Sequence, residues 1–216
     1  MKLQTAIDRV DLDKMLTLGA SLNRYTDIAE VGTSLIKDYG IKASVGALRQ
    51  KYPEMKILAD IKTCDEGAYE FQRAYEAGAD IATVMGFSAN TTIQACAEVA
   101  EAFEKDFFID LLELSEEAVR SICIAYPEAI LGIHLSFDKQ GEGLQDLVKR
   151  STEIIRAAEA ADGKPRRIAA AGGVSLDLIP VLRASGIDTV IVGSAITKSS
   201  DITRAASLFY QACHEI

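Results

Sequence analysis

The sequence alternates eight times between a short apolar run and a longer segment of helical periodicity. The runs are rich in Val, Ile and Ala, which is typical of parallel strands covered on both faces. They begin near Lys2, Asp27, Met55, Asp80, Asp106, Ala129, Arg167 and Thr189. Between them, segments such as 69–77 and 144–161 repeat apolar residues at a helical spacing. The chain therefore predicts an α/β fold in which strand and helix follow each other throughout.

Eight such units share 216 residues, or 27 each (216/8), about the length of one strand and one helix. We predict a single domain over residues 1–216 that closes into a (β/α)8 TIM barrel. An open doubly wound sheet is the alternative, although such sheets usually have five or six strands. Helix N-caps are expected at Asp11, Ser115 and Ser175.

Acidic residues outnumber basic ones, 32 to 23, which gives a net charge of −9. Nucleic acids and anionic membranes attract clustered Lys and Arg, so neither is expected as a partner. The first acid, Asp8, comes too early for a signal-peptide core, and no apolar stretch of about 18 residues follows, so a cytoplasmic location is expected. The four cysteines form no CxxC pair, which argues against a zinc knuckle or a disulfide framework.

In a barrel of this kind, functional side chains lie at the C-terminal ends of the strands. Most of the predicted strand ends carry ionisable residues, namely Asp8, Glu30, Asp60, Lys62, Asp110, Glu113 and His134. Asp60 and Lys62 are two residues apart, so a regular strand would point both into the barrel mouth. Asp65 follows in the next loop or first helical turn. Buried charges are costly unless they are paired or bind a metal, so we interpret these residues as a functional site; a salt-bridge network across the mouth is the alternative.

The chemistry of these side chains indicates a role for each. Glu30 and Asp60, on neighbouring strands, offer oxygen ligands that suit a hard cation such as Mg²⁺. Lys62 is flanked by acids, so it should stay protonated and could stabilise an oxyanion. His134 suits proton transfer at neutral pH, although a histidine in this place can also be a hydrogen-bonded core residue. His214, near the C-terminus, is expected at the surface.

Glycines follow the last two predicted strands, at Gly172-Gly173 and Gly193-Ser194. Backbone N–H groups exposed by such loops can hold a phosphate without any Lys or Arg. The alternative for each glycine separately is a tight turn without a ligand. Because the two loops follow neighbouring strands, we predict a phosphate site.

The longest step between strand starts, from Ala129 to Arg167, contains the polar segment 136–143 with two glycines. A polar loop on the C-terminal side of a strand is a candidate lid. A longer helix with a plain connector is the alternative.

Several motifs resemble a known family. The segment 60–65, Asp-Ile-Lys-Thr-Cys-Asp, matches the Asp-x-Lys-x-x-Asp motif of the orotidine monophosphate decarboxylase suprafamily. Segments 1–8, 30–33, 171–173 and 192–197 resemble the 3-hexulose-6-phosphate synthases within that suprafamily, in order and at compatible spacing. The resemblance covers nearly the whole chain.

The resemblance implies an aldol-type carbon–carbon lyase. Such an enzyme joins formaldehyde to D-ribulose 5-phosphate, giving D-arabino-3-hexulose 6-phosphate through an enediolate that Mg²⁺, or Mn²⁺ in its place, stabilises. By this resemblance Glu30 and Asp60 hold the metal. His134 is the base, Lys62 neutralises the enediolate, and Asp8 positions a substrate hydroxyl.

The resemblance also implies an oligomer and a phosphate site. In this suprafamily the last Asp of the motif commonly reaches into the neighbouring subunit's site, so Asp65 implies a homodimer. The loops at Gly172-Gly173 and Gly193-Ser194 would take the substrate phosphate.

Two alternatives stay open. The 3-keto-L-gulonate-6-phosphate decarboxylases share the same acidic and basic residues, but they typically carry an Arg three residues after the strand-six His and a Gly-Arg at strand eight. Here Phe137 and Gly193-Ser194 stand in those places, which favours the synthases. The synthases usually read His-Thr-Gly-x-Asp, whereas segment 134–138 reads His-Leu-Ser-Phe-Asp. A barrel that binds phosphate without turnover is the second alternative.

Overall fold

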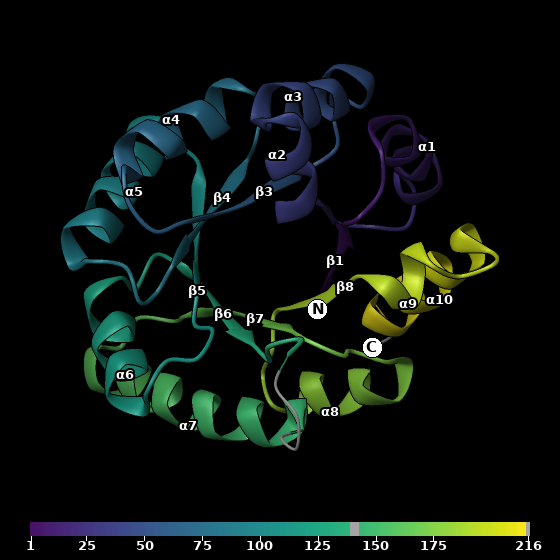
Figure 1. Ribbon diagram of the computed structural model, residues 1–216. Coiled ribbons are helices and arrows are strands. Elements are labelled where there is room, and N and C mark those ends of the chain that lie inside the picture. Colours follow the sequence, from purple (N-terminus) through teal and green to yellow (C-terminus); the bar gives the residue numbers. More distant parts are fainter. Residues whose placement is uncertain (139–142, 215–216) are drawn as a thin grey trace.

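The protein is a closed barrel of eight parallel strands in the order of the sequence, as seen in a computed structural model that describes residues 1–138 and 143–214 (Figure 1). The strands are β1 (Lys2–Ile7), β2 (Ile28–Val31), β3 (Ile57–Thr63), β4 (Ile81–Met85), β5 (Asp106–Asp110), β6 (Ile130–His134), β7 (Arg167–Ala171) and β8 (Thr189–Val192). The barrel closes where β8 pairs with β1, with Val190 opposite Leu3. The predicted (β/α)8 barrel is confirmed, and the open sheet is excluded.

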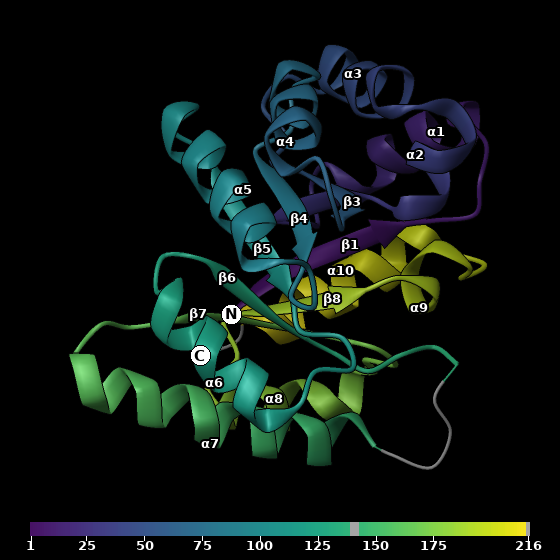
Figure 2. The same cartoon turned by 60° about the vertical axis from the view of Figure 1, so that its left-hand side comes forward.

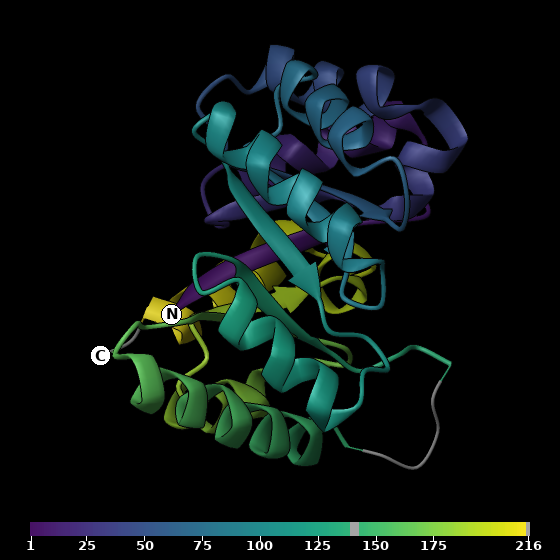
Figure 3. The same cartoon turned by 90° about the vertical axis from the view of Figure 1, so that its left-hand side faces the viewer.

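Helices form a ring outside the strands (Figure 1). They are α1 (Leu12–Leu22), α2 (Thr33–Tyr39), α3 (Ile41–Lys51), α4 (Gly67–Glu76), α5 (Asn90–Ala102), α6 (Glu116–Ala125), α7 (Leu144–Asp162), the short 3-10 helix η1 (Leu176–Leu178), α8 (Ile179–Ala184), α9 (Ser194–Thr197) and α10 (Ile202–His214). Turned views show α6, α7 and α8 on one side of the strands and α1 to α4 on the other (Figures 2 and 3). No helix of the described ranges is long and apolar enough to span a membrane.

Two of the three expected N-caps are confirmed. The side chain of Asp11 accepts a hydrogen bond from the Lys14 N–H, and that of Ser115 accepts one from the Ala118 N–H. The expectation for Ser175 is wrong, because its side chain makes no capping hydrogen bond. The chain enters α8 through the 3-10 turn of η1, and Pro180 in the first turn of α8 has no N–H to be capped.

Apolar side chains form two clusters, one on each side of the strands. The larger cluster joins strand residues such as Leu3 and Ile7 to helix residues such as Met15 and Leu18. The smaller one contains strand residues only, Ile28, Leu58, Ile81, Phe108 and Ala169, with Ile130 and Ile191 packed against it. A cluster without helix residues lies inside the barrel. This cluster fills the barrel interior, and the polar side chains at the C-terminal ends of the strands pack on top of it.

Replacing Gly132 by Ala tests this interior packing. A Cβ atom at Gly132 would lie 2.1 Å from Cε1 of Phe108, inside the apolar cluster. We expect Gly132→Ala to lower the free energy of unfolding by about 1–3 kcal/mol, as overpacking of a filled core usually does. Denaturant unfolding measures the effect. The control is Gly46→Ala in α3, where a Cβ meets nothing closer than 3.8 Å; it should be neutral or stabilising, and an equal loss in both variants would contradict the prediction.

Candidate active site

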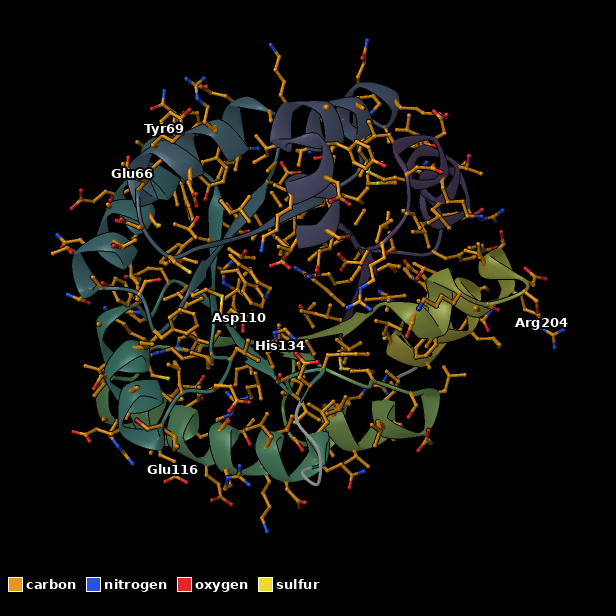
Figure 4. All side chains as sticks on the ribbon, in the orientation of Figure 1. Glu66, Tyr69, Asp110, Glu116, His134 and Arg204 are labelled. Atoms are coloured by element: carbon orange, nitrogen blue, oxygen red, sulfur yellow. The ribbon has the colours of Figure 1, made fainter. Side chains whose placement is uncertain are left out.

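The predicted polar residues lie at the C-terminal ends of the strands. Asp8 follows β1, Glu30 lies in β2, Asp60 and Lys62 lie in β3, and His134 ends β6. Asp110 and His134 point into the centre of the ring of strands (Figure 4). These residues come from well-separated parts of the sequence, and barrel closure brings them together.

Asp110 connects two of the predicted catalytic groups. Its Oδ2 accepts hydrogen bonds from Lys62 Nζ at 2.5 Å and from His134 Nδ1 at 2.9 Å, and its Oδ1 accepts one from the Leu112 N–H. The Asp110 side chain is 3% exposed. Burial alone would raise its pKa, but the hydrogen bond from His134 and the charge of Lys62 hold the pKa below the ordinary value. Asp110 is therefore an anion that orients a cation and an imidazole.

Lys62 lies between two carboxylates. Its Nζ is 3.5 Å from Asp60 Oδ1, in addition to the contact with Asp110. Although burial lowers its pKa, the charges of Asp60 and Asp110 outweigh burial and raise the pKa above the ordinary value. The expectation that Lys62 stays protonated agrees with this electrostatic balance.

Regular strand alternation, which the sequence analysis assumed, does not bring Asp60 and Lys62 together, because β3 is irregular at Lys62. Lys62 adopts a left-handed φ of 49°, and the register of β3 against β4 shifts between Ala59 and Thr63. The Lys62 N–H donates to Thr83 Oγ1 at 2.9 Å, which holds the irregular turn of the backbone. A lysine rarely adopts this conformation without support from its surroundings. The two side chains therefore converge because of a bulge at the site.

The Asp60 carboxylate is held by two hydroxyl groups. Thr33 Oγ1 donates to Asp60 Oδ2 at 2.7 Å, and Thr83 Oγ1 donates to Asp60 Oδ1 at 3.0 Å. Neither threonine is assigned a role by the sequence analysis. Thr33 follows Glu30-Val31-Gly32 in one of the family-like segments, and that position is the one available signal for it.

Glu30 is a buried carboxylate, and in the described part of the chain its one hydrogen-bond donor is an uncharged amide. Gln4 Nε2 donates to Glu30 Oε2 at 2.6 Å. Burial, together with the nearby charge of Asp60, raises the pKa of Glu30 to about 8. Two neighbouring carboxylates that repel each other in a buried place are the arrangement that a divalent cation relieves.

The donor set fits Mg²⁺ rather than a fully enclosed metal cage. The described residues contain no group of three or more His, Cys, Asp or Glu side chains arranged to hold a metal. Glu30 and Asp60 would supply two oxygen ligands, and Mg²⁺ commonly keeps waters and substrate oxygens in its other positions. The residues present are thus compatible with the expected cation.

Asp8 is fixed at the rim by the start of α2. Its Oδ1 accepts from Ser34 Oγ at 2.8 Å and from the Ser34 N–H at 3.3 Å. The carboxylate packs directly on Gly32, where a Cβ would lie 2.2 Å from Asp8 Cγ. Only glycine leaves room for Asp8 in this position.

Asp65 stands apart from the other predicted residues. It is exposed in the loop before α4, and its Oδ1 accepts from the N–H of Glu66. In the described part of the chain, no hydrogen bond or ion pair joins it to Lys62, Asp110 or His134. Figure 4 places the neighbouring Glu66 and Tyr69 at the outer edge of the ring. Glu113, expected on strand five, lies instead in the exposed loop after β5, where its φ of 55° cannot continue a strand.

The two glycine loops follow adjacent strands, β7 and β8. Gly172 and Gly173 have left-handed φ values of 102° and 70°, and a Cβ at Gly172 would lie 2.4 Å from the Leu135 carbonyl oxygen. Gly193 precedes the short helix α9. The two glycine loops therefore lie at the same end of adjacent strands, and the phosphate site stays a prediction.

The candidate lid is described only in part. Ser136, Phe137, Asp138 and Gly143 belong to the described residues, and 139–142 lie outside them. The helix after the loop, α7, has 19 residues and accounts for much of the long step in the sequence. Phe137 is 86% exposed, and the Arg9 guanidinium lies 5.2 Å from the centre of its ring. The lid stays a prediction.

His214 is placed as expected. Its side chain is 38% exposed on α10, and its Nε2 lies 3.4 Å from Asp27 Oδ1. Asp27 directly precedes β2, so the contact is at the opposite end of the barrel from the candidate site.

Comparison with known proteins gives consistent results. The model of the orotidine 5'-phosphate decarboxylase / HUMPS family matches residues 1–209. The 3-hexulose-6-phosphate synthase of Bacillus subtilis (strain 168) is 34% identical over 212 residues, which cover 98% of each chain. That of Mycobacterium gastri is 30% identical over 206 residues, covering 95% of this chain and 96% of the relative.

Solved structures are also similar to this chain. A 3-hexulose-6-phosphate synthase from Salmonella typhimurium superposes with a TM-score of 0.86 at 32% identity, covering 99% of this chain and 98% of the other. A 3-keto-L-gulonate-6-phosphate decarboxylase from Vibrio cholerae gives a TM-score of 0.77 at 26% identity, covering 98% and 96%. Both kinds of enzyme named in the sequence analysis are therefore similar to this chain over its length.

Proposed function

Because this chain belongs to the orotidine 5'-phosphate decarboxylase / HUMPS family, we propose that it is an aldehyde-lyase of the 3-hexulose-6-phosphate synthase type. It joins formaldehyde to D-ribulose 5-phosphate and gives D-arabino-3-hexulose 6-phosphate. The observation that carries the proposal is the joining of Lys62 and His134 by one carboxylate oxygen of Asp110, beside the carboxylates of Glu30 and Asp60. This arrangement suits removal of a proton next to a carbonyl group, with stabilisation of the resulting negative charge.

His134 acts as the base through Nε2. Asp110 is ionised and accepts a hydrogen bond at Oδ2, so Nδ1 of His134 carries the proton. Nε2 is then unprotonated and can act as a base. Nε2 takes the proton from C1 of ribulose 5-phosphate. Carbon C1 then forms the new bond to the formaldehyde carbon, and the formaldehyde oxygen receives a proton from the imidazolium of His134. The proton taken from C1 thus ends on the new hydroxyl group, and His134 returns to its neutral form.

The positive charges of the site would stabilise the negative charge of the enediolate. A divalent cation, Mg²⁺ or Mn²⁺, held by Glu30 and Asp60 would supply Lewis-acid stabilisation of substrate oxygens. Lys62 places its positive charge where the enediolate develops negative charge. Asp8, fixed by Ser34, accepts a substrate hydroxyl at the rim. The backbone around Gly172, Gly173, Gly193 and Ser194 holds the phosphate.

One observation favours the related decarboxylase as a second candidate. The decarboxylases carry an Arg where this chain has Phe137, and here the guanidinium of Arg9 lies over that phenylalanine ring. A cation is thus available near the same place, where it could meet a substrate carboxylate.

A direct assay separates the candidates. The protein is incubated with ribulose 5-phosphate, formaldehyde and Mg²⁺, and formaldehyde loss is followed. CO₂ release from 3-keto-L-gulonate 6-phosphate is measured in parallel. Formaldehyde loss supports the synthase, CO₂ release without it would replace that proposal by the decarboxylase, and inactivity in both would leave a phosphate-binding barrel.

The proposal includes the whole chain, 1–216, acting as one catalytic domain in a homodimer. Asp65 contributes to the partner's site, which is supported by its exposed place away from the residues of its own barrel mouth. Tyr69 and Phe87, each 58% exposed, are large apolar side chains on neighbouring segments, as a subunit contact would use. The absence of a nucleic-acid or membrane partner is proposed on the net charge of −9. A cytoplasmic location stays a prediction.

Mixing two inactive variants tests the shared site. Asp65→Ala and Lys62→Ala are each expected to be nearly inactive alone. In a mixed dimer, one site combines the intact Lys62 of one subunit with the intact Asp65 of the other. Random exchange in a two-fold dimer should restore about 25% of wild-type activity. Exchange is confirmed by native mass spectrometry of tagged subunits, and mixed dimers without recovered activity would show that Asp65 does not act across the interface.

A further inference from the structure

Gln4 is a buried amide in an apolar layer of the barrel interior. It is 2% exposed, and it lies in register with Ile28 of β2 on one side and Ile191 of β8 on the other. Both neighbours belong to, or pack on, the apolar cluster inside the barrel. A buried amide is unfavourable unless it is hydrogen-bonded, so packing alone would favour Leu or Met at this position. The reason for Gln4 should therefore lie in its contact.

That contact is with the candidate metal ligand. Gln4 Nε2 donates to Glu30 Oε2 at 2.6 Å, between neighbouring strands. Glu30 lies two residues beyond Ile28 along β2, so Gln4 reaches from the apolar layer up to the polar one. Among the described residues, no side chain or backbone group donates to Glu30 Oε1. One carboxylate oxygen is held and the other is left available.

We propose that Gln4 is a positioning residue for the divalent cation: it fixes Oε2 of Glu30 so that Oε1 faces the ion. The inference rests on the proposed function, in which Glu30 and Asp60 hold that ion. Gln4 does for Glu30 what the hydroxyls of Thr33 and Thr83 do for Asp60. All three donors are uncharged, so they orient the two carboxylates without adding a positive charge to that of Lys62. A Lys or Arg in place of Gln4 would compete with the ion.

The test is Gln4→Met, a side chain of similar length that suits the apolar layer. The probe is Mn²⁺ alone, titrated calorimetrically into substrate-free protein. Loss of an outer partner of a metal ligand typically weakens binding about 10- to 100-fold, and we expect a change in this range. The melting temperature in EDTA should stay close to that of the wild type, whereas the increase on adding Mn²⁺ should shrink. A role in packing alone would not reduce that increase.

Thr5→Val is the matched control. Thr5 is the next residue of β1, equally buried, with a hydroxyl bonded to Thr26 and not to Glu30. Its Mn²⁺ affinity should equal that of the wild type. Should Gln4→Met lower the melting temperature in EDTA, Gln4→Asn provides a second variant, because it keeps the amide but is one methylene too short to reach Glu30.

The outcomes separate this inference from the proposed metal site. Glu30→Gln is titrated alongside. If Glu30→Gln loses Mn²⁺ binding and folded Gln4→Met binds within twofold of the wild type, the role of Gln4 is wrong and the metal site stands. If the wild type itself binds no Mn²⁺, both the proposed metal site and the proposed role of Gln4 are wrong. Weakened binding in Gln4→Met with normal binding in Thr5→Val supports the proposal.

Discussion

Lys62→Ala is expected to lower kcat/KM by at least about 100-fold, because loss of a charge that stabilises a developing oxyanion usually has this effect. The Lys62 ammonium is held between Asp60 and Asp110, at 3.5 and 2.5 Å, and its side chain is 27% exposed. It is thus fixed in place and still accessible from the barrel mouth. Steady-state kinetics with ribulose 5-phosphate and formaldehyde measure the effect. A loss in kcat larger than the change in KM would identify a contribution made in the transition state.

The control for Lys62 is an ion pair at the other end of the barrel. Lys56 Nζ lies 3.0 Å from Asp106 Oδ2, beside the start of β5, and Lys56→Ala removes this pair without touching the site. It should keep normal kinetics. Circular dichroism and melting curves of Lys62→Ala show whether the fold is intact. A folded Lys62→Ala variant with near-normal turnover would mean that the reaction takes place elsewhere.

The barrel itself was accessible to sequence analysis because its signal is local. Each apolar run of four to seven residues is followed by a helical segment, and such a signal needs no knowledge of neighbouring strands. Failures occurred where the backbone departs from regular geometry. The bulge at Lys62 and the 3-10 turn after Ser175 depend on contacts with other elements, which the residue pattern does not contain.

Individual site residues were predictable for a similar reason. Charged residues at strand ends are visible in the sequence because they are costly to bury, so Glu30, Asp60 and His134 could be chosen one by one. Their connections could not. That Asp110 joins Lys62 to His134, or that Gln4 reaches Glu30, depends on the register between strands and on the radius of the closed barrel. Asp110 was recognised at a strand end, but its role was not. Neutral partners such as Gln4, Thr33 and Thr83 give no charge signal at all, and these residues were missed.

Asp110→Asn should damage catalysis as severely as the loss of Lys62, although Asp110 contacts no substrate in the proposed reaction. An asparagine cannot present an anionic oxygen to both Lys62 Nζ and His134 Nδ1. It can also donate a hydrogen bond to Nδ1, which would place the imidazole proton on Nε2 and remove the base. General base catalysis contributes roughly 10²–10⁴-fold to the rate, and a wrong histidine tautomer can cost about 10⁴-fold. We therefore expect kcat to fall by that order, with a smaller effect on KM.

Stability gives an independent measure of the Asp110 charge. The folded protein holds the pKa of Asp110 below its ordinary value, so ionised Asp110 stabilises the fold above the ordinary Asp range, and this contribution is lost as the pH falls through the folded pKa. The wild type should exceed Asp110→Asn in melting temperature near neutral pH, and the gap should narrow in acid. Asp138→Asn, at an exposed aspartate whose backbone N–H bonds to Ser136, is the control and should show no such gap. If the difference in melting temperature between the two proteins does not change with pH, Asp110 contributes by packing. The proposal that the charge of Asp110 orients His134 would then be wrong.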